Sequence, residues 1–383
     1  MGSEFEAIPE FTMLQNRMRQ FIADQGGAIP FDAFMQESLY GRTDSYYQSR
    51  VNIDYQINGG DWPTYAIRPY FAELLSRPIF RQLSEFNGQG QLVELGGGTG
   101  AFKANILKLG QDQGLKFKYI SIDNSRKLHH LQAQYGGESY LTSALNLPLA
   151  DRSVNGVIFA NELVDAFPVR YLRAVITNDV FSHFEELRYR VKRNNIEHQW
   201  LPADDAQIRE YWLRQREVLE LTDGFSWDWD ILNHQMMAVN TLQADLIREC
   251  SRVLNKGKII LIDYGNTIYN LLRKGAKWTI FASPDHLNTN VENMHRLAYF
   301  ADLSALVNFS DLEIVARQSG LTVQWYGPQR HFLWEQITSQ EEVEVKKQLR
   351  ENPTAYTLNI QLLKNEGSDG TSKVLVLTRS GAD

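Results

Sequence analysis

A cluster of glycines beside an acidic residue is the part of this sequence that points most directly to chemistry. The segment VELGGGTG spans residues 93–100 and follows an apolar run that predicts a β-strand. Glycine is needed where the backbone takes a positive φ angle or must approach a ligand closely. We expect a helix to begin near Thr99, and the N–H groups and partial positive charge at its start suit an anion. The segment therefore predicts an anion-binding turn, with Gly96, Gly98 and Gly100 as cofactor-binding residues.

Two anions fit this turn. One is the carboxylate of S-adenosylmethionine (SAM), and the other is a dinucleotide pyrophosphate, because the glycines and Ala101 also match a loose dinucleotide pattern. Glu94 favours SAM, since an acid two residues before Gly96 suits a cationic amino group and would repel a pyrophosphate. The next predicted strand ends at Asp123, followed by Asn124, and the Asp123 carboxylate can accept both ribose hydroxyls of either cofactor. We predict SAM as the cofactor; a dehydrogenase and a purely structural turn are the alternatives.

Polar residues also follow the next predicted strands. Residues 142–162 resemble the run after the third strand of class I methyltransferases, where a loop contacts adenine and the following strand carries groups to the ligand crevice. On this basis we assign Ser143, Ala144 and Asn161 to cofactor binding.

Three carboxylates are the candidates for catalysis. Glu162 and Asp165 follow the predicted strand at 154–160, at the sheet edge where open α/β sheets bind ligands. Methyl transfer needs an in-line nucleophile and, if that nucleophile carries a proton, a nearby base. Glu162 and Asp165 are candidates for this base, although Asp165 is as well suited to cap a following helix. Asp263 ends another predicted strand and is either a cleft carboxylate or a turn residue.

The elements that must position these residues alternate between short apolar strands and helices from residue 91 onward. This alternation predicts a Rossmann-like α/β fold with a mostly parallel twisted sheet covered by helices on both faces. Antiparallel strands and a helix interrupt the pattern at about 171–235, which we interpret as an insertion. We expect an N-terminal helical or lid region at 1–88 and a SAM-binding domain at 89–383. Residues 1–5 look like a cloning remnant.

The residues between these motifs give further local expectations. Pro30 is a start signal for a helix that we expect to open in the segment 29–35. Residues 236–254 read as one helix, followed by a turn at 255–257. The aromatic run at 225–229 suits either a pocket wall or the packing of a lid.

Composition limits the other classes of function. The net charge of −7 and the pI of about 5.7 argue against a nucleic-acid partner. The basic cluster at 188–193 is better explained as a solvated strand edge. His286, His295 and His331 are scattered without metal-ligand spacing, so we expect no metal. The single cysteine, Cys250, lies in a helical apolar pattern and predicts a buried thiol in a reducing, cytoplasmic setting. No apolar run is long enough to cross a membrane.

At these motifs the sequence resembles the MidA-type methyltransferases, which include the mitochondrial complex I assembly factor methyltransferase and bacterial relatives. The resemblance covers most of the chain. It implies a class I methyltransferase fold with SAM as cofactor and, in the best-known members, methylation of an arginine on a partner protein. The landmarks are IPFDAFMQESLYG at 29–41, GDWPT at 60–64, VELGGGTG at 93–100, IDNS at 122–125, NELVDAFPVR at 161–170, GKIILIDYG at 257–265 and ADLSALVNF at 301–309.

The departures from the family pattern concern mainly the acceptor side. The usual proline of the glycine loop is Gly97 here, and the Ser-Pro-Glu expected after Thr64 is missing. Four further positions lack the family's polar or acidic residue and carry Ala238, Ser304, Leu306 and Asn308. A guanidinium acceptor favours carboxylates in a fork geometry. These losses weaken the arginine interpretation and favour a small-molecule or peptide acceptor.

Three hypotheses therefore stand. The first is a methyltransferase acting on a nucleophilic oxygen or nitrogen of a small molecule or peptide. The second is a protein arginine methyltransferase that acts in the assembly of a respiratory complex. The third is a catalytically silent SAM-binding assembly protein.

Overall fold

The computed structural model describes residues 9–41, 44–49, 64–178, 180–203, 205–220, 236–274, 280–283, 291–351 and 372–380. The chain forms two compact units, each assembled from three stretches of sequence. The first unit contains residues 1–55, 164–245 and 265–314, and the second contains residues 56–163, 246–264 and 315–383. The domain boundary expected near residue 88 stays a prediction. The remnant expected at 1–5, the aromatic run at 225–229 and His286 lie outside the described residues.

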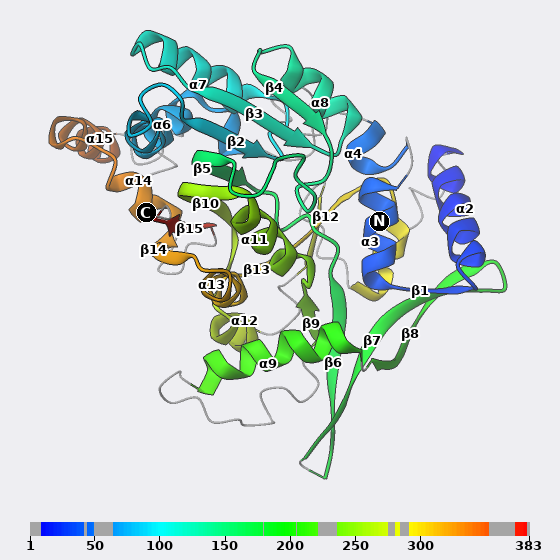
Figure 1. The fold of residues 1–383 in the computed structure, drawn as a ribbon. Helices are drawn as coiled ribbons and strands as arrows, with labels where there is room; N and C mark the ends of the chain where they lie inside the picture. The colour runs from blue at the N-terminus through cyan, green and yellow to red at the C-terminus, as the bar shows by residue number, and fades with distance from the viewer. Residues whose placement is uncertain are drawn as a thin grey trace. The chain divides into compact units, whose positions relative to one another are not determined.

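The second unit is built on a twisted sheet in the order β14-β15-β10-β5-β2-β3-β4 (Figure 1). The run from β10 to β4 is parallel, while β15 pairs antiparallel with both β10 and β14. The strands are β2 (Gln91–Leu95), β3 (Lys118–Asp123), β4 (Glu138–Leu141), β5 (Val154–Asn161), β10 (Leu254–Asn266), β14 (Thr322–Pro328) and β15 (Ser372–Arg379). The predicted mostly parallel α/β sheet is confirmed.

Both faces of this sheet are covered. Ile260 and Ile262 of β10 belong to a core cluster with residues of α6 (Pro69–Ser84) and α7 (Ala101–Asp112). The alternate residues Ile259 and Leu261 point to the opposite face of the strand and are also buried. Strands buried on both faces read as continuous apolar runs, which explains why these strands were recognisable in the sequence. Further helices that lie wholly in this unit are α8 (Arg126–Ala133), α14 (Gln329–Trp334) and α15 (Ser339–Glu351), with a 3₁₀ turn at Tyr65–Ile67.

The first unit contains an antiparallel sheet in the order β1-β7-β6-β9, with β8 paired to β7. Its strands are β1 (Ala28–Pro30), β6 (Arg170–Thr177), β7 (Val180–Lys192), β8 (Asn195–Ala203) and β9 (Met236–Val239). Further elements are α2 (Pro9–Asp24), α3 (Phe31–Tyr40), α4 (Tyr46–Ser49), α9 (Ala206–Glu220), α12 (Ile268–Lys274), the 3₁₀ helix Val291–Leu297, and the short strands β11 (Ile280–Ser283), β12 (Asp302–Ala305) and β13 (Val307–Asn308). The predicted antiparallel segment is present, and its β7–β8 turn uses Arg193 and Asn194 at positive φ.

Several local expectations were wrong. Residues 236–239 form strand β9 rather than the start of a helix, because alternate residues are buried and β9 pairs with β6. The helix α11 begins only at Leu242 and runs to Val253. No turn follows it, since β10 begins at Leu254 with an irregularity before Lys256. The basic cluster at 188–193 is not a strand edge, because β7 pairs there with both β1 and β8.

The buried cysteine and the helix that opens near Pro30 agree with the sequence. The Cys250 thiol is buried in α11, and burial raises its pKa to about 12. The helix expected to open near Pro30 is α3, with Pro30 as its N-cap residue. Between β13 and β14 the chain forms α13 (Phe309–Gln318). Among the described residues, no helix has the length and apolar character needed to cross a membrane, and no group of three or more His, Cys, Asp or Glu side chains is arranged to hold a metal ion.

Candidate cofactor and methyl-transfer site

The predicted site residues of the second unit meet at one edge of its sheet. The register places Leu95 opposite Ile122 on one side and Ala160 on the other. It also places Asn161 opposite Ile262. The carboxyl ends of β2, β3, β5 and β10 are therefore level, so the residues that follow each strand are brought to a common edge. This is the edge at which open α/β sheets bind ligands.

The glycine loop joins β2 to α7 and has a backbone that other residues would strain. Gly96 has φ +67°, Gly98 has φ +53° and Gly100, the N-cap of α7, has φ +81°. A Cβ atom on Gly96 would lie 2.8 Å from Leu163 Cδ1. A Cβ atom on Gly97 would lie 2.6 Å from the Glu94 carboxylate oxygen, so the position at which the family pattern has proline is closed to a side chain here. These constraints explain the run of glycines.

Asp123 ends β3 and has its carboxylate held by the protein. The Ser125 backbone N–H donates to Oδ1 at 2.8 Å, and Gln132 Nε2 donates to Oδ2 at 2.7 Å. Burial raises the pKa of Asp123 to about 6, against the lowering effect of these two hydrogen bonds. A buried carboxylate at this point is chemically suited to a pair of hydroxyl donors such as a ribose diol.

Glu94 lies beneath the glycine loop. Its side chain is only 3% exposed, and Tyr119 donates a hydrogen bond of 2.6 Å to Oε2. Burial raises the pKa of Glu94 to about 7; the Tyr119 hydrogen bond and the Lys103 ammonium oppose this rise, and the Asp123 carboxylate adds to it. At neutral pH the group is therefore poised between its neutral and charged forms. A cation brought to the loop would favour the charged form.

The remaining cofactor candidates occupy turns and strand ends. Ser143 and Ala144 form the turn after β4, where Ser143 Oγ accepts the Leu145 N–H at 3.1 Å. Asn124 is exposed directly after β3, and Asn161 is the half-buried last residue of β5. All four lie in the second unit together with Asp123 and the glycine loop.

Glu162 lies one residue beyond β5 in an unusual backbone conformation. Its φ is +50°, which is rare for a residue with a side chain and occurs often at functional sites. Its N–H donates to the Ile262 carbonyl at 2.8 Å, which extends the β5–β10 ladder by one residue. Its Oε1 accepts a hydrogen bond of 3.0 Å from Thr64 Oγ1, and the Thr64 hydroxyl in turn accepts the Ala66 N–H at 3.2 Å. The hydroxyl proton is thereby directed at Glu162.

The other two catalytic candidates differ from Glu162 in their surroundings. Asp263 is 2% exposed and accepts the Leu163 N–H at 3.2 Å and the Tyr264 N–H at 2.7 Å. These contacts favour the turn-bracing alternative for Asp263. Asp165 belongs to the first unit, where its backbone carbonyl accepts the Ala305 N–H at 2.8 Å. The alternative that Asp165 caps a following helix is wrong, because a turn and then strand β6 follow it.

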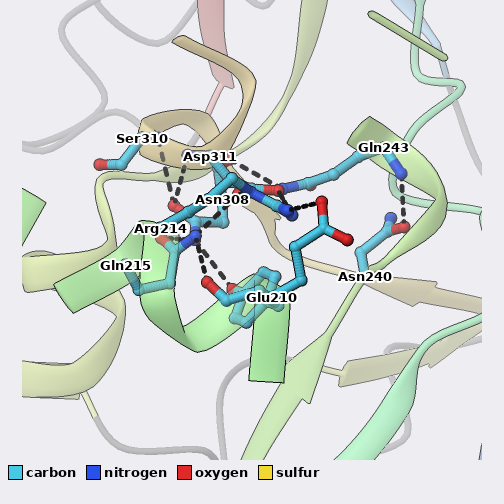
Figure 2. A network of polar contacts seen from close by, with 9 residues as sticks. Glu210, Arg214, Gln215, Asn240, Gln243, Asn308, Ser310 and Asp311 are labelled. Carbon is cyan, nitrogen blue, oxygen red and sulfur yellow. Dashed lines mark hydrogen bonds and ion pairs between the residues drawn. The ribbon is translucent and has the colours of Figure 1, made fainter. Parts of the chain in front are cut away.

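The first unit holds a buried polar network around Asn308, one of the positions where the sequence departs from the family pattern. Asn308 donates to Gln215 Oε1 at 2.7 Å and to the Tyr211 hydroxyl at 2.9 Å. Asp311 accepts from Arg214 Nε and from Gln215 Nε2, each at 2.7 Å, and from Gln243 Nε2 at 2.9 Å (Figure 2). Asn308 is thus a structural hydrogen-bonding residue that joins α9 to the start of α13.

An apolar pocket lies in the same unit. Two of its lining residues, Ala238 and Leu306, stand where the family pattern carries polar groups. The described residues that line it include no charged side chain: Tyr211, Trp212, Met236, Met237, Ala238, Val239, Ile268, Leu271, Leu272 and Leu306.

A family profile decides the class of the protein. The profile described as "Putative S-adenosyl-L-methionine-dependent methyltransferase" matches residues 74–327. The chain belongs to this methyltransferase family. The matched region includes the glycine loop, Asp123, Glu162 and Asp263. SAM is thus the cofactor of this methyltransferase, as the glycine loop and Glu94 had predicted.

Solved structures with the same fold support the architecture of the methyltransferase. A crystal structure of a protein from Burkholderia thailandensis bound to S-adenosyl-homocysteine has a TM-score of 0.74 and 21% identity, over 96% of this chain and 92% of that one. A native crystal structure from the same organism has a TM-score of 0.70 and 20% identity, over the same shares. No curated protein sequence matches the chain significantly. The predicted class I methyltransferase fold is confirmed.

The residues of the methyltransferase fit its cofactor. The glycine loop gives close backbone approach, Asp123 supplies a buried carboxylate, and Glu94 supplies an acid able to balance a positive charge. The buried amide oxygen of Gln132 has no hydrogen-bond partner among the described residues, which leaves an acceptor beside Asp123 that a ligand donor would satisfy.

Sequence reasoning named neither Thr64 nor Gln132 as a site residue. Thr64 was noted only as part of the GDWPT landmark, and the sequence carries no sign that its hydroxyl meets a carboxylate 98 positions away. Gln132 lies in none of the motifs recognised in the sequence. Its location on the buried side of α8, against the glycine loop, could have been suggested only by the helical period.

Proposed function

We propose that this methyltransferase is of the MidA type and that it transfers a methyl group to a nucleophilic oxygen or nitrogen of a small molecule or peptide. The observation that carries the acceptor class is the loss of the family's polar or acidic residues at the positions of Ala238, Ser304, Leu306 and Asn308. A guanidinium acceptor calls for carboxylates, and their loss favours another nucleophilic oxygen or nitrogen.

Some residues of the chain bind the cofactor, and one residue accepts the acceptor's proton. Glu94, the glycines at 96, 98 and 100 and Asp123 hold the cofactor, with Asn124, Ser143, Ala144 and Asn161 around its adenosine. When bound, SAM supplies a methyl carbon activated by a positively charged sulfur. The acceptor atom would take that methyl group, S-adenosyl-homocysteine would leave, and the acceptor's proton would go to a base of the chain.

Glu162 is the residue that we assign as this base. It stands at the carboxyl edge of the sheet, its backbone is held in a strained conformation, and the Thr64 hydroxyl orients its carboxylate. The strain is maintained by the ladder hydrogen bond to Ile262. Preorganised carboxylates of this kind lower the cost of reaching the reactive geometry. Asp165 is the second candidate, and Asp263 supports the turn through its backbone contacts.

The alternative is a protein arginine methyltransferase that acts in respiratory complex assembly. It is favoured by the segment NELVDAFPVR at 161–170, which retains both Glu162 and Asp165. A second alternative, a SAM-binding assembly protein without turnover, predicts cofactor binding with no methyl transfer to any acceptor class.

A screen for S-adenosyl-homocysteine release tests these functions. Purified full-length protein is given SAM with pools of amines, hydroxyl compounds and carboxylates, and in parallel with arginine-containing peptides. We expect turnover with an amine, hydroxyl compound or carboxylate and none with the arginine peptides. Glu162→Gln should lower turnover at least 100-fold while leaving S-adenosyl-homocysteine affinity within twofold. Turnover only on arginine peptides would refute the acceptor proposal, and retained turnover in the variant would refute the assignment of the base.

A further inference from the structure

Gln132 is a fully buried polar residue near the cofactor site for which the reaction, as described so far, has no role. It lies on α8, and its side chain is 0% exposed. A methionine or leucine would fill the same space without bringing polar atoms into the core. Buried polar atoms are costly unless their hydrogen bonds are needed.

The hydrogen bonds of this amide all go to the cofactor site. Nε2 donates to the Gly98 carbonyl at 2.9 Å and to Asp123 Oδ2 at 2.7 Å. Both partners are acceptors, so the orientation of the amide is fixed by its surroundings. Its oxygen has no donor among the described residues. The side chain therefore leaves one buried polar atom unpaired while it joins the glycine loop to the ribose-binding carboxylate.

Close packing makes this connection rigid. A Cβ atom on Gly97 would lie 3.2 Å from Gln132 Cδ, and one on Gly100 would lie 3.1 Å from Gln132 Cα. The loop thus rests directly on this part of α8. Loop and carboxylate come from two different strands, β2 and β3, and Gln132 contacts both from a third element.

We propose that Gln132 is a positioning residue for cofactor binding. It holds the Asp123 carboxylate in the orientation that accepts the ribose hydroxyls, and it fixes the position of the glycine loop relative to that carboxylate. The proposal rests on the proposed cofactor site. Without the Nε2 bond to Oδ2, the Asp123 carboxylate keeps only the Ser125 N–H bond to Oδ1, so its second oxygen is no longer held by a hydrogen bond from α8.

The test is the affinity of the full-length protein for S-adenosyl-homocysteine and for 5′-methylthioadenosine, which keeps adenine and ribose but lacks the amino-acid group. Gln132→Met should raise the Kd of both ligands by tenfold or more and by similar factors. The matched control is Gln134→Met, the same exchange at an exposed position just after α8, which should leave both Kd values within twofold. The midpoint of thermal unfolding without ligand shows whether Gln132→Met is folded.

A double-mutant cycle separates positioning from a general loss of structure. In the Asp123→Ala background, Gln132→Met should raise the Kd by a clearly smaller factor than in the wild-type protein, because one of the two groups that it positions is gone. If Gln132→Met raises the Kd by the same factor in the Asp123→Ala background as in the wild-type protein, the two residues act independently and the proposal is wrong. A loss of S-adenosyl-homocysteine affinity with unchanged 5′-methylthioadenosine affinity would also overturn it. If the wild-type protein binds both ligands and Gln132→Met binds them equally well, the proposal fails while the cofactor site stands. A wild-type protein that binds neither ligand would instead refute the cofactor site itself.

Discussion

Proton release on cofactor binding gives a direct test of the role assigned to Glu94. Burial raises the pKa of this carboxyl group to about 7 in the folded chain. At pH 7 about half of the molecules therefore carry a proton on Glu94. If the cationic amino group of the cofactor binds beside it, the charged form is favoured and the proton leaves. Binding of S-adenosyl-homocysteine at pH 7 should then release up to about 0.5 proton from this group.

Calorimetric titration in two buffers with different ionisation enthalpies measures this number. The perturbation is Glu94→Gln, which keeps the size and polarity of the side chain but cannot titrate. We expect proton release by the wild-type protein, a smaller exchange in Glu94→Gln, and a Kd for S-adenosyl-homocysteine about tenfold higher in the variant. Tyr119→Phe is the matched control: it removes the hydrogen bond that lowers the Glu94 pKa, so release should move to higher pH. Equal proton exchange by wild-type protein and Glu94→Gln would refute the pairing of Glu94 with the amino group of the cofactor.

The same shift predicts a stability effect with a defined sign. A carboxyl group whose folded pKa lies above its ordinary value of 4.5 binds its proton more tightly in the folded chain. Its contribution favours folding at low pH and is lost as pH rises through about 7. At about 1.4 kcal/mol per pH unit, the loss approaches about 3 kcal/mol. Urea unfolding should therefore show Glu94→Gln more stable than wild type at pH 8 and similar to it at pH 4.5; a variant that is less stable at pH 8 would contradict the reasoning.

Three further predictions concern the cofactor loop and the base. Gly98→Val should abolish S-adenosyl-homocysteine binding in calorimetry, because valine strongly disfavours φ +53° and adds bulk where the backbone must meet the ligand; retained affinity would remove the loop from the site. Asp123→Ala should weaken binding by about 1–3 kcal/mol through the loss of hydroxyl partners, and an unchanged Kd would move the ribose contact elsewhere. Thr64→Val should lower kcat about tenfold with unchanged cofactor affinity, and Thr64→Ser, which keeps the hydroxyl, should restore it; equal activities would mean that Thr64 does not orient Glu162.

The sequence alone was sufficient to predict the sheet of the second unit and its ligand edge. Strands buried on both faces leave continuous apolar runs, and the glycine loop leaves its own pattern because few other residues can adopt its backbone. Since parallel strands end at the same edge, Asp123, Asn161 and Glu162 could be assigned to that edge without coordinates. These are local signals, in which residue type directly limits backbone conformation or burial.

Helix and strand were harder to separate where apolar runs were short. The segment Met236–Val239 suited either type, and pairing with β6 decided it. The basic residues at 188–193 resembled a strand edge, but β1 and β8 pair with them on both sides. Long-range pairing of this kind leaves little trace in the local sequence.

The side-chain partners were decided only by the tertiary structure. Glu94 and Asp123 could be read as acids near a cofactor, but their raised pKa values come from burial, which the sequence does not state. The hydrogen bond from Thr64 to Glu162 joins residues 98 positions apart, and Gln132 meets Gly98 from 34 positions away. The sequence therefore determined which residues reach the ligand edge, because strand direction and glycine geometry are local properties. The fold decided which groups hold those residues in place, because only packing brings distant segments within hydrogen-bond distance.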